Sequence, residues 1–402
     1  MTVRIMRTFI TTALAAIAIS SPASAFETPA PKAAAVFLGK AASGSNYTVK
    51  PTVRSDGAMR IFDVDTPYGA YKFVGVDFAK LRLHELAAVA VLEKMSHSKA
   101  FGKALERAAV APVKFGFGLL ANPVGVIGKS LDGVANTVDR FGAGIKNHKA
   151  SRDPMLDSLF GVSDAQRELA VELDVDPYSD FPPLKTKLRK MAQAMASGGL
   201  PVKAGLAMIP GGAGHIVSAI TTASKAKDSL RDKTAAQVIA ESRAILLSLK
   251  VPAKTVSRLV ENRHYTPADL LIMAHALEQL RARNTTAFVD VAARAGSRNA
   301  AFYQRRRAEL LARHNKQLGG ISSFVVVAGQ PINQARSGDY VAAFTYDDIA
   351  WTKRQQRLFS AMASEFRRGK SGKAVVLATA GTGTATAAGE IRKLGWTIVP
   401  LR

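Results

Sequence analysis

YTVKPTVRSDGAMRIFDVDTPYGAYKFVGV, residues 47–76, organises the N-terminal part of this chain. Its runs of β-branched and aromatic residues are separated by the turn formers Asp56-Gly57 and Pro67-Tyr68-Gly69. Short β-rich runs joined by such turns are typical of antiparallel hairpins, so the stretch predicts a three-stranded meander. Three strands alone are barely stable, and we therefore expect the meander to pack against a helix. Asp77 is placed to cap that helix, which the pattern predicts over residues 78–96.

The remainder of the chain is mainly helical in pattern until residue 320. Thr266, followed by Pro267, marks the start of one of these helices. Beyond residue 320 the pattern predicts strands at 323–329, 339–346, 374–379 and 397–401, with helices at 352–368 and 384–394. Strands that alternate with helices favour a small α/β layer with some parallel pairing. The predicted fold class is mainly α-helical, with a short N-terminal antiparallel β-meander and a small C-terminal α/β layer.

The first 25 residues have the features of a secretory signal peptide. Arg4 and Arg7 precede a short apolar run, and Ala23-Ser24-Ala25 forms an A-x-A cleavage site. The apolar run is shorter than a comfortable bilayer span, although an uncleaved N-terminal anchor is the alternative. We therefore expect an exported protein located in the periplasm, possible peripheral association with an envelope membrane, and a mature chain that begins at Phe26.

The composition limits which classes of partner an exported chain of this kind could bind. The protein has no cysteine, so it has no disulfides, and its formal net charge is +24. Outside the cytoplasm, the counter-charges available to such a protein are acidic lipid head groups, lipopolysaccharide phosphates, anionic wall polymers or an acidic protein. We expect an anionic lipid or envelope polymer as the partner, or a protein, and no nucleic acid.

These patterns divide the chain into six segments. We expect a signal peptide (1–25), a flexible tether (26–46), the β-meander plus helix (47–97), a Gly-containing amphipathic helical segment (98–150), a helical domain (151–320) and a small α/β domain (321–402).

The segment 98–150 contains NPVGVIGKSLDGVANTVDRFGAGI, residues 122–145. Its apolar residues fall at helical spacing in one narrow stripe, whereas its glycines each weaken a helix by about 1 kcal/mol relative to alanine. Such a helix needs a surface to lie on, and the candidates are the protein core, a partner groove or a membrane. The stripe consists of Val124, Ile127, Leu131, Val134, Val138, Phe141 and Ile145.

No motif in the sequence indicates catalysis, a cofactor or a bound metal. The glycines in AGTGTATAAGE (380–390) fit no phosphate-loop spacing and predict a tight strand-to-helix turn. The histidines show no metal-ligand spacing. Asp347 and Asp348 precede Trp351 at a strand-to-helix junction, where they are either an acid/base pair or the acids that favour a helix N-terminus.

Basic residues are concentrated in two predicted helices, with few acids among them. Solvated helix faces usually carry both signs of charge, so this imbalance favours an anionic partner. The residues predicted to bind an anionic surface are Arg298, Arg305, Arg306, Arg307, Arg313, Lys353, Arg354 and Arg357.

Several of these features together resemble a family of uncharacterised exported proteins of Gram-negative bacteria. The resemblance covers most of the mature chain and rests on structural motifs, so it implies the order of domains and an envelope location but no activity. The shared features are the SDG-containing meander, the R-x-x-E-L helix (82–86), the ANPVGVIGKSLDGVANTVDRF stretch (121–141), VDPYSDFPPL (175–184), NRHYTP (262–267) and LGWTIV (394–399).

The leading hypothesis is a non-enzymatic envelope protein that binds an anionic surface through its basic helices and the amphipathic stripe. One alternative is a periplasmic hydrolase acting on envelope material, for which Asp347, Asp348 and His314 should converge in a cleft. The other is a structural scaffold for a protein partner, which a large exposed apolar patch would favour.

Overall fold

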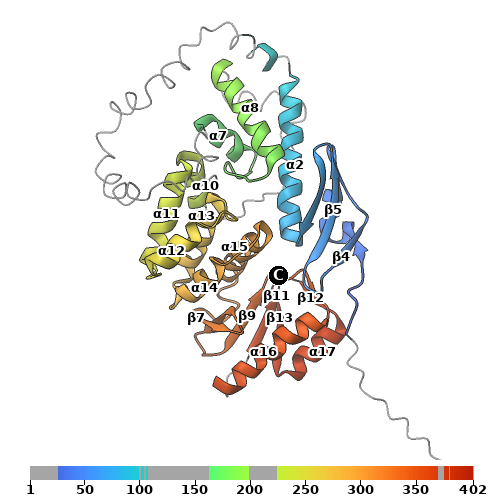
Figure 1. Cartoon of the computed structure of the whole chain (residues 1–402), viewed down its shortest axis with the longest axis vertical. Helices are drawn as coiled ribbons and strands as arrows, with labels where there is room; N and C mark the ends of the chain where they lie inside the picture. Colours follow the sequence, from blue (N-terminus) through green and yellow to red (C-terminus); the bar gives the residue numbers. More distant parts are fainter. Residues whose placement is uncertain are drawn as a thin grey trace, which may run out of the picture.

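The computed structural model describes residues 26–98, 101–103, 106, 163–198, 224–369, 375–379 and 381–401. Helices contain 54% and strands 20% of this part of the chain, and the strands form two large sheets (Figure 1). The fold is therefore mixed α/β, and the prediction of a mainly α-helical fold is wrong. The expected signal peptide and the stripe at 124–145 lie outside the described residues.

The N-terminal sheet is antiparallel and has six strands rather than three. The two predicted turns are confirmed, at 56–59 and 67–68. Pro51, which has no N–H to donate, divides the first predicted strand into two strands that both pair with one edge of β5. The strands are β1 (Lys32–Ala33), β2 (Ser43–Gly44), β3 (Tyr47–Val49), β4 (Thr52–Ser55), β5 (Arg60–Thr66) and β6 (Gly69–Val74).

Residues 26–46, interpreted as a flexible tether, supply part of this sheet. They contain β1 and β2, the helix α1 (Ala34–Leu38) and a 3-10 turn η1 (Gly39–Ala42). Ala34 and Leu38 are buried in the same core as the strands, so the segment is packed against the protein from Lys32 onward.

Helix α2 (Val76–Ser96) covers the N-terminal sheet, which confirms the expected packing of the meander against a helix. Phe62 and Phe73 from the sheet meet Leu83 and Leu86 from the helix in one core, which the helices α7 (Asp164–Glu172) and α8 (Pro182–Gly198) complete. The predicted cap is wrong, because the helix begins one residue before Asp77 and its N-cap is Gly75.

A second group of helices follows. The start predicted at Thr266 is confirmed, since its hydroxyl accepts from the N–H of Asp269 and Pro267 occupies the first turn. These helices are α10 (Ser224–Asp232), α11 (Ala235–Ser248), α12 (Ala253–Val260), α13 (Pro267–Leu280), α14 (Thr285–Ala292) and α15 (Arg298–Arg313).

The C-terminal sheet has the strand order β13-β11-β9-β8-β7, with β9, β11 and β13 parallel to one another. The expected α/β layer with parallel pairing is therefore present. The sequence did not predict β8, because its QPINQA segment contains proline and amides instead of β-branched residues. The strands are β7 (Ile321–Val327), β8 (Gln330–Ala335), β9 (Tyr340–Phe344), β10 (Asp348–Ile349), β11 (Val375–Thr379), β12 (Thr382–Gly383) and β13 (Trp396–Pro400).

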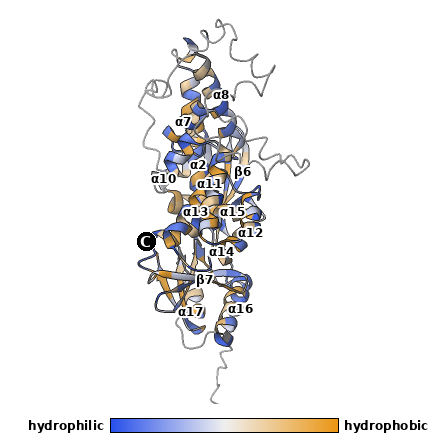
Figure 2. Cartoon of the chain, turned by 90° about the vertical axis from the view of Figure 1, so that its left-hand side faces the viewer, coloured by the Kyte–Doolittle hydropathy of each residue, from blue (hydrophilic) through white to orange (hydrophobic). Residues whose placement is uncertain are grey.

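Helices cover both faces of this sheet. Helices α14 and α15 share a core with one face, and α16 (Lys353–Gly369) and α17 (Ala385–Lys393) share a core with the other (Figure 1). The helices in Figure 2 carry both hydrophobic and hydrophilic residues. Within the described ranges, none of them combines the length and the hydropathy that a bilayer span requires.

Candidate functional site

The C-terminal ends of β9 and β11 lie side by side, which is the edge where parallel α/β sheets bind ligands. Here the loop after β9 carries Asp347 and Asp348, and the glycine-rich loop follows β11. Strands β10 and β12 join the two loops by parallel pairing. A Cβ added to Gly381 would lie 2.0 Å from the carbonyl oxygen of Asp347, so this glycine allows close packing of the loops. Thr384 caps α17 by accepting from the N–H of Ala387 at 3.0 Å.

The turn between β4 and β5 fills this edge from the N-terminal sheet. The N–H of Asp347 donates to the carbonyl of Ala58 at 2.9 Å, and the N–H of Ala350 donates to the carbonyl of Gly57 at 3.0 Å. A Cβ on Gly57 would lie 2.7 Å from the Thr352 side chain, so the fit is close there too. The ligand edge of the C-terminal sheet is thus occupied by the chain itself.

The Asp347 carboxylate holds two N-terminal elements in place. It accepts from the N–H of Arg60 at 2.7 Å and from the N–H of Val76, the first residue of α2, at 3.0 Å. Burial, helped by the neighbouring charges of Asp77 and Asp348, raises the pKa of Asp347 to about 7. The interpretation of these acids as belonging to the N-terminus of the helix that follows them is therefore wrong, because Asp347 serves the N-terminus of α2 and not that of α16.

Asp348 forms a buried ion pair with Arg60. The hydroxyl of Ser55 donates to Asp348 at 3.3 Å, and the Lys32 ammonium lies 3.6 Å from it. His314 is instead hydrogen-bonded to Gln317 at the end of α15. The three residues expected in a hydrolase site therefore have separate structural roles.

Arg298, Arg305 and Arg306 bind carboxylates of the protein itself. Arg298 bridges Asp180 at 3.0 Å and Asp269 at 2.8 Å. Although burial opposes ionisation, Arg82 and Arg298 hold the pKa of Asp180 below its usual range. The network continues through α15 to α2, in the order Asp269, Arg305, Glu309, Arg306, Asp77.

Arg307 is fully buried and donates to the carbonyl of Ala343 at 2.7 Å. Its second donor reaches the carbonyl of Pro331, and its guanidinium lies over the Phe344 ring. The prediction that Arg298, Arg305, Arg306 and Arg307 bind an external surface is therefore wrong. These side chains instead join α15 to α2, to α13 and to the C-terminal sheet.

The other predicted basic residues are exposed. Arg313 ends α15, while Lys353, Arg354 and Arg357 begin α16. Helix α16 buries Phe359, Met362, Ala363 and Phe366 against the sheet. Its outer side carries a set of exposed cations that we call the α16 basic face: Lys353, Arg354, Arg357, Arg367 and Arg368.

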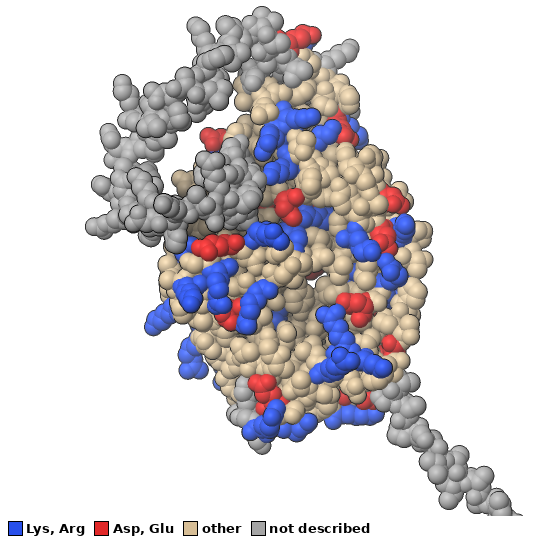
Figure 3. Space-filling view, viewed as in Figure 1, with Lys and Arg blue, Asp and Glu red and all other residues tan. Residues whose placement is uncertain are grey.

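Few carboxylates lie close to the cations of the α16 basic face. The acid of α16, Glu365, accepts from the N–H of Ala328 at 2.7 Å and so serves the β7–β8 turn. Arg354 has one acidic neighbour, Asp56, at 3.3 Å. In the described ranges, no carboxylate lies within ion-pair distance of Arg357, Arg367 or Arg368. Figure 3 shows blue side chains, with some red ones among them, over the lower part of the molecule, where Figure 1 places α16 and α17.

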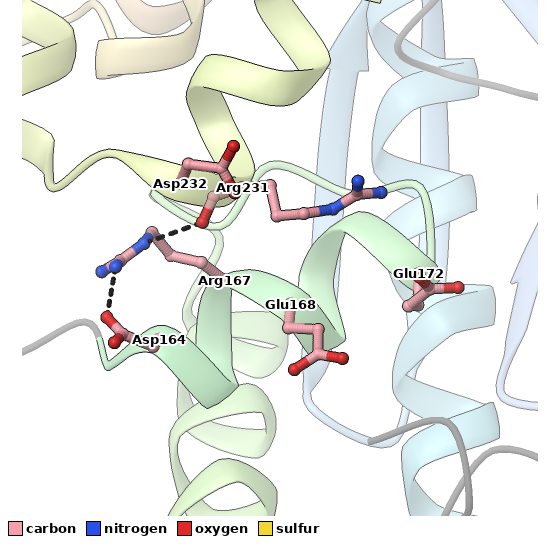
Figure 4. Close-up of a pocket in the computed structure, with 6 residues that line it drawn as sticks. All are labelled: Asp164, Arg167, Glu168, Glu172, Arg231 and Asp232. Atoms are coloured by element: carbon pink, nitrogen blue, oxygen red, sulfur yellow. Dashed lines mark hydrogen bonds and ion pairs between the residues drawn. The ribbon is translucent and has the colours of Figure 1, made fainter. Parts of the chain in front are cut away.

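A polar pocket of about 410 Å³ lies between α7 and α10 (Figure 4). Arg167 crosses it, pairing with Asp164 and donating to the carbonyl of Arg231 at 3.1 Å. The lining consists of carboxylates and guanidinium groups, with no histidine or hydroxyl side chain among them. Its residues are Asp164, Arg167, Glu168, Glu172, Arg231 and Asp232.

Two further observations concern alternative sites. In the part of the chain that the structure describes, no group of three His, Asp or Glu is arranged to hold a metal. The large hydrophobic residues that are exposed in that part come from four separate segments of the sequence. They are Phe26, Val36, Leu247 and Val326.

Comparisons with family models, with curated proteins and with solved structures found no match to this chain.

Proposed function

We propose that this protein is a non-enzymatic, exported envelope protein that binds the anionic face of a lipid membrane through the α16 basic face. The observation that carries the proposal is the one-sided charge of α16, whose apolar side is buried in the core and whose outer side holds exposed cations. Because Glu365 is engaged by the β7–β8 turn, the helix offers no exposed acid that would repel phosphate groups.

The neighbouring helix adds to this charge. Arg392 and Lys393 are exposed at the end of α17, which packs on the same face of the C-terminal sheet as α16. Each Lys or Arg near an anionic membrane contributes about 1 kcal/mol. Arg354 is paired with Asp56 and Lys393 with Glu390 at 2.7 Å, so the other five cations of the two helices give about 5 kcal/mol, which corresponds to a Kd of about 0.2 mM. Such binding is reversible and depends on salt.

Vesicle flotation tests this proposal with residues 26–402. Recovery with anionic but not neutral phospholipid vesicles, lost between about 50 and 500 mM salt, is the expected result. Vesicles containing lipopolysaccharide and a soluble wall polyanion form separate arms, and binding to the polymer alone would overturn the choice of a membrane.

Charge-reversal variants test whether vesicle binding depends on α16. The variant Arg357→Glu, Arg367→Glu, Arg368→Glu should lose flotation. The matched control reverses the exposed Lys40, Lys254 and Arg263, which changes the net charge equally on α12 and other distant elements. Equal loss in both variants would mean that net charge, and not this face, is responsible.

A further inference from the structure

Residues 26–33, which we call the N-terminal strap, cross from the C-terminal domain to the N-terminal sheet. At one end the N–H of Glu27 donates to the carbonyl of Trp351 at 2.9 Å. The Glu27 carboxylate accepts from the N–H of Trp351 at 2.5 Å and from the hydroxyl of Thr384 at 2.7 Å. At the other end, β1 pairs with β4. The strap thus links the two sheets.

The middle of the strap covers the ion pair between these sheets. Arg60, the partner of Asp348, donates to the carbonyl of Ala30 at 2.9 Å. Lys32 lies 3.6 Å from the same aspartate. The strap therefore supplies one of the acceptors of the buried Arg60 guanidinium.

Little apolar burial holds the strap closed. Phe26 is 38% exposed, and Thr28 and residues 30–33 are also exposed. Segments that are held by a few polar contacts near solvent open at low free-energy cost. The Glu27 side chain provides two of the hydrogen bonds that hold the strap on the C-terminal domain.

The closed strap lies at the start of the α16 basic face. The Lys353 ammonium is 5.8 Å from the centre of the Phe26 ring. Glu27 binds the backbone N–H of Trp351, two residues before Lys353. The strap therefore places an aromatic ring against the first cation of α16, with Glu27 bound to the backbone that leads into this helix.

We propose that the N-terminal strap is an autoinhibitory latch, and this inference rests on the proposed function. With the latch closed, Glu27 holds the strap over the first turn of α16 and weakens its attraction for anionic lipid. An anionic membrane competes with Glu27 for this region and favours the open strap. Because the coupling is reciprocal, a variant that opens the strap binds the membrane more tightly.

The variant Glu27→Gln tests the latch, since it keeps the side-chain shape and removes the charge that anchors it. The control is Asp65→Asn, which changes the net charge equally at the exposed far end of β5. Glu27→Gln should bind vesicles of anionic phospholipid about fivefold more tightly than Asp65→Asn. Thermal unfolding by circular dichroism verifies that both variants are folded.

A distance measurement reports the strap directly. The chain has no native cysteine, so spin labels attach only to the two cysteines introduced by Thr28→Cys and Lys254→Cys. The distance distribution should broaden in Glu27→Gln, and also in the unmodified strap when anionic vesicles are added. Equal affinity of Glu27→Gln and Asp65→Asn, or an unchanged distribution on vesicle binding, would overturn the latch alone. Absence of vesicle binding by every variant would overturn the proposed function itself.

Discussion

The Asp347 carboxylate accepts a hydrogen bond from the N–H of Val76, which lies 271 positions earlier in the chain. It thereby satisfies one of the backbone donors at the start of α2 that have no acceptor within the helix, at an end where the N-cap Gly75 has no side chain. A C-terminal loop and an N-terminal helix are thus joined by one buried acid, and its protonation affects both.

Asp347→Asn should change how stability depends on pH. The pKa of Asp347 is about 7 in the folded protein, against 3.8 as its ordinary value. The folded state therefore binds this proton more tightly, so the stabilisation is complete below pH 3.8 and is lost as the pH rises through 7. Relative to Asp347→Asn, the free energy of unfolding of the native protein should fall by about 1.4 kcal/mol per pH unit across this window. Parallel pH profiles from urea titrations would contradict the assignment.

Breaking the Arg60–Asp348 pair from one side should destabilise the protein strongly. Arg60→Met leaves the Asp348 carboxylate buried without its main partner, at a cost of about 3–5 kcal/mol. The double variant Arg60→Met, Asp348→Leu should recover part of this loss, because no charge remains buried. Arg54→Met removes the exposed pair with Asp63 and should cost less than about 1 kcal/mol. Urea unfolding measures all three, and equal effects of Arg60→Met and Arg54→Met would refute the role of burial.

Arg307→Met should also be destabilising, for a different reason. It leaves the carbonyls of Ala343 and Pro331 without this donor inside the protein, and each buried unsatisfied group costs about 1–3 kcal/mol. Arg313→Met, on the exposed end of the same helix, should change the free energy of unfolding by less than about 0.5 kcal/mol. Similar thermal midpoints for the two variants would show that Arg307 does not hold β8 and β9 in place.

Gly381→Ala and Gly389→Ala should have effects of opposite sign. The added Cβ at Gly381 meets the backbone of Asp347, and overpacking of this kind costs about 1–3 kcal/mol. Gly389 lies inside α17 with no atom within 4 Å of the new Cβ, so alanine there should stabilise by up to about 1 kcal/mol. Differential scanning calorimetry distinguishes the two, and a destabilising Gly389→Ala would count against the helix assignment.

The sequence predicted those turns and helix starts that depend on the residues at the turn or the helix end themselves. Asp56-Gly57 and Thr266-Pro267 marked a turn and a helix start, because Gly adopts the positive φ that such a turn needs and Pro fixes φ near its helical value. The strap and its anchor Glu27 had no such signal. Strand β1 forms by pairing with β4, about 20 positions later, and β2 has only two residues, so the same segment looked like a tether.

The basic residues of α15 show why the candidate site was only partly predictable. Their partners are distant in sequence: Asp180 is 118 positions from Arg298, and Asp77 is 229 positions from Arg306. A count of nearby charges cannot detect such pairs. Helical spacing did contain a signal, because Arg298, Phe302, Arg305 and Glu309 lie on one face with a buried aromatic ring among them.

Asp347 lies near the end of the chain, so the N-terminal elements that it holds are synthesised before it. Synthesis proceeds at about 5–20 residues per second, so Val76 is made roughly 15 to 55 s before its acceptor exists. During that interval the first turn of α2 and the guanidinium of Arg60 lack the carboxylates that hold them. The N-terminal sheet therefore cannot complete these contacts until residues 347 and 348 have been synthesised.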